Sequence, residues 1–118
     1  NGPRLVYICA PLRGDVERNI AFAKEKAREV FQAGDVPVCP HLMFPPIADP
    51  EAPVQDQAAR EMGLRLVETC QQVNVYGAAR TPGMQAEIRR AEELGIPVKT
   101  EQPAIKKTKS RSRQGQAR

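Results

Sequence analysis

Arg13 and Gly14 are the first residues in the chain whose types suggest chemistry. They follow an apolar run at residues 4–10 and precede Asp15, a residue type that favours the start of a helix. Backbone N–H groups at a helix N-terminus attract anions, and an arginine can add bidentate hydrogen bonds to a phosphate. The pair therefore indicates an anion site, although a surface arginine beside a turn glycine would have the same sequence. The segment matches neither the glycine pattern of dinucleotide-binding folds nor a P-loop.

Glu87 is the second candidate, on a helix that Thr81 and Pro82 are expected to open as N-cap and first helical residue. It stands one residue before Ile88 and three after Met84, which we expect on the buried face of that helix. Its carboxylate should therefore lie near the edge of the core. A carboxylate there is either a functional group or a partly buried member of an ion pair.

His41, the single histidine, follows a predicted strand at residues 36–39. It could act as an acid, contact a base or be an ordinary loop residue. Cys9, Cys39 and Cys70 are scattered, so we expect buried small side chains rather than zinc ligands. No metal site and no organic cofactor is indicated, and unpaired cysteines fit a reducing cytoplasmic setting.

The apolar pattern predicts the elements that would position these residues. Strands are expected at 4–10, 36–39, 73–77 and 96–98, and helices at about 16–33, 56–70 and 82–94. Gly34 and Gly95 are expected to end the first and last helices. Strands that alternate with helices predict an α/β fold: a three-layer, doubly wound parallel sheet of flavodoxin-like or Rossmann-like type.

The helices should bury one apolar face each. The residues expected on these faces are Val16, Ile20, Ala23, Ala27, Val30 and Phe31, then Met62, Leu66, Val67 and Cys70, then Met84, Ile88, Ala91 and Leu94.

Ligands of open parallel sheets bind beyond the carboxyl ends of the strands. This rule selects the loops at 10–15, 40–53 and 77–87, which contain the three candidates. The middle loop has five prolines, so we expect it to lack regular structure. A long loop of this kind is commonly functional or disordered.

The charge is distributed unevenly along the 118 residues. Six of the 18 basic residues and none of the 14 acidic ones lie in 104–118, which leaves residues 1–103 with a net charge of −2. We therefore expect one domain at 1–103 and a basic, disordered tail at 104–118. The tail could contact nucleic acid weakly or only aid solubility, and the domain's charge does not fit a reader of duplex DNA. No apolar run approaches the roughly 20 residues of a membrane span, and no signal peptide is visible, so a cytoplasmic protein without membrane contact is expected.

Two runs together resemble the nucleoside 2-deoxyribosyltransferase superfamily, and especially its deoxynucleoside monophosphate N-glycosidases. They are VYICAPLRG at 6–14 and GMQAEIRRA at 83–91. The runs CPHLMFP at 39–45 and ELGIPV at 93–98 are similar to a bacterial and phage branch of that superfamily. The resemblance spans about residues 4–99. It implies a nucleoside or nucleotide ligand and cleavage or transfer at the N-glycosidic bond, without a cofactor.

The resemblance also implies roles for individual residues. Glu87 would be the nucleophile that attacks the anomeric carbon, and Tyr7 would hold its carboxylate in place. Water as acceptor gives hydrolysis, and a second base gives transfer. The residues expected to contact the substrate are Ala10, Arg13, Gly14, His41, Gly83 and Met84.

The chain departs from its relatives at Gly63 and Gln71, near places where they usually carry aspartate. The acid that would protonate the departing base is therefore not assigned, and Asp56, Glu61 and His41 are candidates. A non-catalytic nucleotide-binding sensor of the same fold is the alternative. Since relatives complete their sites with a neighbouring subunit, the resemblance implies a homodimer or a larger homo-oligomer.

Overall fold

The computed structural model describes residues 2–101, and the predicted tail at 104–118 lies outside this range. Within it the elements are β1 (Leu5–Cys9), α1 (Val16–Gln32), β2 (Val36–Val38), α2 (Pro40–Met43), α3 (Pro53–Thr69), β3 (Gln72–Val75), α4 (Pro82–Glu93) and β4 (Val98–Thr100). The strands form a four-stranded sheet in the order β2-β1-β3-β4, and every neighbouring pair is parallel. The prediction of an α/β fold with a parallel sheet is confirmed.

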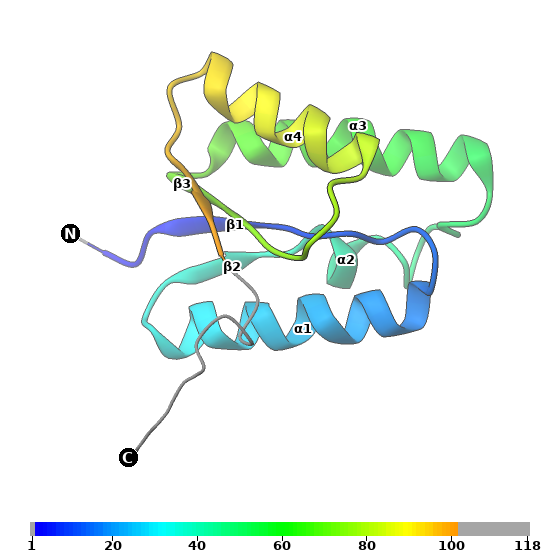
Figure 1. The fold of residues 1–118 in the computed structure, drawn as a ribbon, viewed down its shortest axis with the longest axis horizontal. Helices are drawn as coiled ribbons and strands as arrows, with labels where there is room; N and C mark the ends of the chain where they lie inside the picture. Colours follow the sequence, from blue (N-terminus) through cyan, green and yellow to red (C-terminus); the bar gives the residue numbers. More distant parts are fainter. Residues whose placement is uncertain (1, 102–118) are drawn as a thin grey trace.

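Helices cover both faces of this sheet (Figure 1). The alternating side chains of β1 take part in two separate cores. Val6 and Ile8 pack with Ala23, Ala27 and Val30 of α1. On the other face Tyr7 and Cys9 pack with α3 and α4, through Val67, Met84, Ile88 and Ala91. Because β1 is buried on both sides, its sequence is a continuous apolar run rather than an alternating one.

The ends of the long helices follow their capping residues. The Asp15 side chain accepts a hydrogen bond from the Arg18 N–H at 3.2 Å, and Thr81 accepts one from the Met84 N–H at 3.2 Å. Gly34 and Gly95 follow the first and last helices with φ of 96° and 73°, a conformation that favours glycine. These predicted caps are confirmed.

The proline-rich loop contains more helix than we predicted. Pro40 opens α2, and Pro53 opens α3 three residues before the expected start. Proline fits these positions because a backbone N–H in the first helical turn has no acceptor within the helix, so its absence breaks no hydrogen bond. The prediction that residues 40–53 lack regular structure is therefore wrong at both ends of the loop.

Three residues predicted on buried helix faces are exposed: Phe31, at 70%, Met62 and Leu94. Phe31 lies in the last turn of α1, and Leu94 is the C-cap residue of α4. On α3 the buried residues are Asp56, Gly63 and Val67, which places Met62 on the solvent side. All three cysteines are buried, as predicted.

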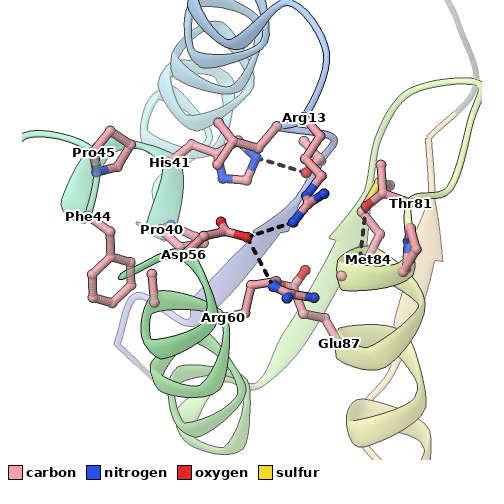
Figure 2. Close-up of a pocket in the computed structure, with 15 residues that line it drawn as sticks. Arg13, Pro40, His41, Phe44, Pro45, Asp56, Arg60, Thr81, Met84 and Glu87 are labelled. Carbon is pink, nitrogen blue, oxygen red and sulfur yellow. Dashed lines mark hydrogen bonds and ion pairs between the residues drawn. The ribbon is translucent and has the colours of Figure 1, made fainter. Parts of the chain in front are cut away.

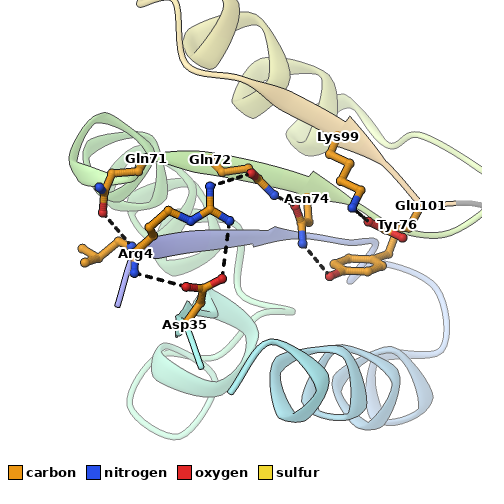
Figure 3. Close-up of polar contacts among 9 residues, drawn as sticks. Arg4, Asp35, Gln71, Gln72, Asn74, Tyr76, Lys99 and Glu101 are labelled. Atoms are coloured by element: carbon orange, nitrogen blue, oxygen red, sulfur yellow. Dashed lines mark hydrogen bonds and ion pairs between the residues drawn. The ribbon is translucent and has the colours of Figure 1, made fainter. Parts of the chain in front are cut away.

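A set of polar side chains joins the amino ends of the strands (Figure 3). The Arg4 guanidinium donates to Gln72 Oε1 at 3.1 Å and to Asp35 Oδ2 at 3.4 Å, so it links the starts of three strands. Further along β3, Asn74 accepts from Gln72 Nε2 at 2.7 Å and donates to the Tyr76 hydroxyl at 3.0 Å. These bonds satisfy a buried asparagine that interrupts an otherwise apolar strand.

Pro37 is the middle residue of β2, an edge strand. Val36 donates its N–H inward to the Arg4 carbonyl of the β1 side at 2.8 Å. Successive backbone groups of a strand point to opposite sides, so the nitrogen of Pro37 faces the open edge, where proline is tolerated.

No helix within residues 2–101 is long and apolar enough to cross a membrane.

Candidate active site

A pocket of about 230 Å³ lies beyond the carboxyl ends of β1 and β2, between α2, α3 and the start of α4 (Figure 2). This volume is near the lower end for small-molecule sites. Four segments line it: the loop after β1 (Ala10, Leu12, Arg13), α2 and the residues after it (Pro40, His41, Phe44, Pro45), α3 (Asp56, Ala59, Arg60) and the start of α4 (Thr81, Pro82, Gly83, Met84, Glu87).

Glu87 provides a partly buried carboxylate to this pocket. The Tyr7 hydroxyl donates to Glu87 Oε2 at 2.7 Å, and the nearby Cys9 thiol donates to the Met84 carbonyl at 3.8 Å. Burial raises the pKa of Glu87 above its ordinary value, and the Tyr7 hydroxyl and the Cys9 thiol oppose this effect. Burial and the neighbouring Glu87 carboxylate raise the pKa of Tyr7 well above its ordinary range. The tyrosine therefore keeps its proton and holds one carboxylate oxygen in a fixed position.

Gly63 lets α3 approach this Tyr7–Glu87 pair. A Cβ atom at Gly63 would stand 3.0 Å from the Tyr7 hydroxyl oxygen and 3.6 Å from Glu87 Oε2. Glycine inside a helix costs about 1 kcal/mol relative to alanine. The close contact gives a physical reason for glycine at this position despite that cost, because a larger residue would displace the hydroxyl or the helix.

Asp56 contacts two arginines, Arg13 from the loop after β1 and Arg60 from the next turn of α3, as the dashed lines in Figure 2 show. Arg13 Nη2 donates to Asp56 Oδ2 at 3.1 Å, and Arg60 Nε lies 3.4 Å from the same oxygen. The Asp56 side chain is 7% exposed, whereas those of Arg13 and Arg60 are 68% and 43% exposed. Two guanidinium groups share one carboxylate, so the cluster keeps one net positive charge at the pocket.

His41 ties α2 to the loop that follows β1. Its Nε2 lies 2.8 Å from the Ala10 carbonyl and 3.1 Å from the Pro11 carbonyl. Both partners can only accept, so this nitrogen must carry a proton. Burial lowers the pKa of His41, against the effect of these two bonds. The ring is therefore neutral at neutral pH and fixes the wall of the pocket.

Gly83 and Met84 lie in the first turn of α4, where the backbone borders the pocket. A Cβ atom at Gly83 would meet Arg60 Cδ at 3.5 Å, which is ordinary van der Waals contact. Gly83 therefore has space for a small side chain.

The fold brings most of the predicted site residues together. Those that line the pocket are Ala10, Arg13, His41, Gly83, Met84 and Glu87, with Tyr7 bonded to Glu87 behind it. Gly14 lies outside this lining, in a shallower hollow beside Val16 and Pro50. Its φ of 100° gives it a role in the turn. Of the candidates for the acid, Asp56 and His41 line the pocket, whereas Glu61 is exposed and bonded to Gln57.

Sequence reasoning missed Arg60 and the apolar wall formed by Phe44 and Pro45. Arg60 follows Asp56 by four residues on a predicted helix, a spacing that could have indicated the pair. No comparable signal marked Phe44, because the short helix before it was not predicted.

Residues 2–101 bring no three His, Cys, Asp or Glu side chains together in a metal-binding arrangement.

No curated protein matches the chain. The family described as Domain of unknown function (DUF7768) matches residues 4–101, which include every residue of the pocket. The chain therefore belongs to the DUF7768 family.

Proposed function

We propose that this pocket cleaves, or transfers at, the N-glycosidic bond of a nucleoside or nucleotide, on a doubly wound domain of flavodoxin-like or Rossmann-like type. Glu87 is the nucleophile and Tyr7 positions it. The observation that carries the proposal is the 2.7 Å hydrogen bond from a buried tyrosine to a partly buried carboxylate that lines the pocket.

The chemistry suits this pair. Breaking an N-glycosidic bond builds positive charge on the sugar, which a carboxylate stabilises or traps as a covalent ester. Tyr7 occupies Glu87 Oε2, so the other oxygen remains for the anomeric carbon. Because the hydroxyl is fixed inside the core, the carboxylate needs little reorganisation when charge develops on the sugar.

The arginine cluster favours a nucleotide over a nucleoside. Arg13 and Arg60 share the single charge of Asp56, and both guanidinium groups are partly exposed. A 5′-phosphate would gain charge-assisted hydrogen bonds from them. The same argument gives Arg13 the anion-binding role that its place after β1 predicts.

The test is base release from a panel of nucleosides and 5′-monophosphates, ribose and 2-deoxyribose forms alike, with free base measured by chromatography. Wild-type protein should release base. Glu87→Gln should abolish release and keep its affinity for a neutral-base monophosphate within roughly tenfold. Glu92→Gln removes an exposed carboxylate from the same helix and should behave as wild type. Full activity in Glu87→Gln would show that Glu87 is not the nucleophile.

A nucleotide-binding sensor that performs no chemistry is the second candidate. It is favoured by one observation: the pocket groups that could donate a proton to a departing base are engaged elsewhere, as His41 is with two carbonyls. Tight binding of a monophosphate without base release from any panel member, with water or a second base as acceptor, would support the sensor.

We also propose that the chain forms a homo-oligomer. Ile47 and Val54, in the segments next to the pocket residues Phe44 and Asp56, are 80% and 82% exposed. Large apolar side chains of this kind are common at subunit contacts. Light scattering during size-exclusion chromatography would give the mass, and a monomer at all concentrations would contradict the proposal.

A further inference from the structure

We propose that the substrates of this pocket are nucleotides whose base carries a positive charge, such as pyridinium nucleotides and N7-alkylated purine nucleotides. The inference rests on the proposed function, since it takes Glu87 as the group that acts on the anomeric carbon. The proposal concerns the class of base that can depart from the sugar in this pocket.

A neutral base and a cationic base differ in what they need in order to leave. When the bond from C1′ to nitrogen breaks, both electrons stay on the nitrogen. A neutral base becomes an anion unless an acid protonates it, and such an acid contributes about 10² to 10⁴ in rate. A cationic base becomes neutral through the same step, so it needs no acid.

The two groups nearest Glu87 carry protons but are too weakly acidic to pass them to a departing base at neutral pH. Tyr7 donates its proton to Glu87 itself, and burial raises the pKa of this phenol. Burial also raises the pKa of the Cys9 thiol far above its ordinary value. Neither group lines the pocket, where the base would stand.

The other groups that could act as the acid line the pocket and already have other contacts. The His41 Nε2–H points to the Ala10 and Pro11 carbonyls, and burial lowers the pKa of the ring, so its other nitrogen carries no proton. Asp56 Oδ2 accepts from Arg13 and lies 3.4 Å from Arg60 Nε, as an acceptor rather than a donor. The Thr81 hydroxyl caps α4 and is too weak an acid for this task.

The charge of Glu87 points the same way. Its hydrogen-bond partner is a neutral group, the Tyr7 hydroxyl, and within residues 2–101 no salt bridge reaches it. A partly buried carboxylate without a salt bridge loses part of its hydration, and a cationic ring beside it would offset this cost. Phe44 provides an aromatic wall, a surface that also attracts cations. The arginine cluster is left to hold the phosphate.

The reaction balances with the residues present. A Glu87 oxygen bonds to C1′ as the bond from C1′ to the base breaks, and the electron pair of that bond neutralises the base. Water then attacks C1′, the bond from C1′ to the Glu87 oxygen breaks, and the carboxylate is restored. The proton of the water passes to solvent.

The first experiment compares matched substrates with the full chain. The pairs are N7-methylguanosine monophosphate against guanosine monophosphate, and nicotinamide mononucleotide against adenosine monophosphate, with free base measured by chromatography. We expect kcat/KM to be about 100-fold higher for the cationic members. This is the factor by which the reaction of a neutral base would be slowed when no acid protonates it. Equal rates for guanosine monophosphate and its N7-methyl form would overturn the inference and leave the proposed function standing.

The second experiment measures binding, so it does not depend on turnover. Oxidised nicotinamide mononucleotide has a cationic ring, and its reduced form has a neutral ring of similar shape. Wild-type protein should bind the oxidised form about tenfold more tightly, a modest share of what a charge pair can contribute. Glu87→Gln should lose this preference and Glu92→Gln should keep it. Equal affinity of wild type for both forms overturns the inference. If the protein prefers the oxidised form but releases no base from any substrate, the pocket is a cation-selective binding site and the proposed function is rejected.

Discussion

Gly63→Ala tests the contact on which the geometry of the Tyr7–Glu87 pair depends. In an ordinary helix this change would stabilise the fold by about 1 kcal/mol. Here the new Cβ would stand 3.0 Å from the Tyr7 hydroxyl oxygen, closer than nearly all real Cβ contacts. Overpacking of this kind costs about 1 to 3 kcal/mol. The two terms together predict a free energy of unfolding that is unchanged or lower by up to about 2 kcal/mol.

Tyr7→Phe provides the matched background, because it removes the oxygen that the new methyl group would meet. In that background Gly63→Ala should show only its helical benefit and stabilise the fold by up to about 1 kcal/mol. The double-mutant cycle should therefore give a coupling energy of about 1 to 3 kcal/mol. For a domain of this size, each kcal/mol shifts Tm by about 4 to 8 °C.

The assay is urea denaturation of the four proteins, followed by circular dichroism. Ultraviolet titration of Tyr7 adds a readout that a purely structural change would not move. A displaced hydroxyl should lose part of its contact with Glu87, so the raised pKa of Tyr7 should fall towards its ordinary value. If Gly63→Ala stabilises both backgrounds equally, the close approach of α3 is not what requires glycine at this position.

Three further predictions concern Glu87, Arg13 and the tail. The raised pKa of Glu87 means that its contribution to stability is present below its ordinary value of 4.5 and is lost as pH rises through the folded-state pKa. Glu87→Gln should therefore raise Tm relative to wild type at pH 7, and the difference should shrink below pH 4.5; equal differences at both pH values would contradict this. Arg13→Ala should weaken binding of a 5′-monophosphate by about 1 to 3 kcal/mol and change nucleoside binding much less, measured by calorimetry with Arg28→Ala as an exposed control. Equal weakening of both ligands would show that Arg13 does not contact the phosphate. A chain that ends at residue 103 should keep its Tm within about 2 °C, since terminal segments of this composition add little packing, and loss of cooperative unfolding would reject the predicted domain boundary.

The parts of the fold that could be predicted from sequence are those set by local chemistry. Asp15 and Thr81 open helices because their side chains accept from the N–H three residues on, and Gly34 ends one because of its positive φ. Spacing also placed Glu87 near the edge of the core, where the structure has it. Short-range patterns report such features directly.

The rest of the site depends on distances across the fold. Arg13 and Asp56 are 43 residues apart and meet because α3 packs against β1, which no periodicity specifies. Gly63 was noticed as a departure from the relatives, but its contact with the Tyr7 hydroxyl requires the packing of α3 on β1. Phe31 and Leu94 are exposed although they fit the apolar pattern, since that pattern does not say which residues at a helix end are covered by the rest of the fold.

Pro37 limits how two copies of this chain can associate. A free edge strand offers backbone donors on which another strand can pair, the route by which many proteins extend their sheets or aggregate. Pro37 turns a nitrogen without hydrogen to the open side of β2, in a strand of only three residues. Such an edge is a poor template for a further strand. The homo-oligomer that we propose should therefore not pair strands at β2, and its sheets should end within each subunit on that side.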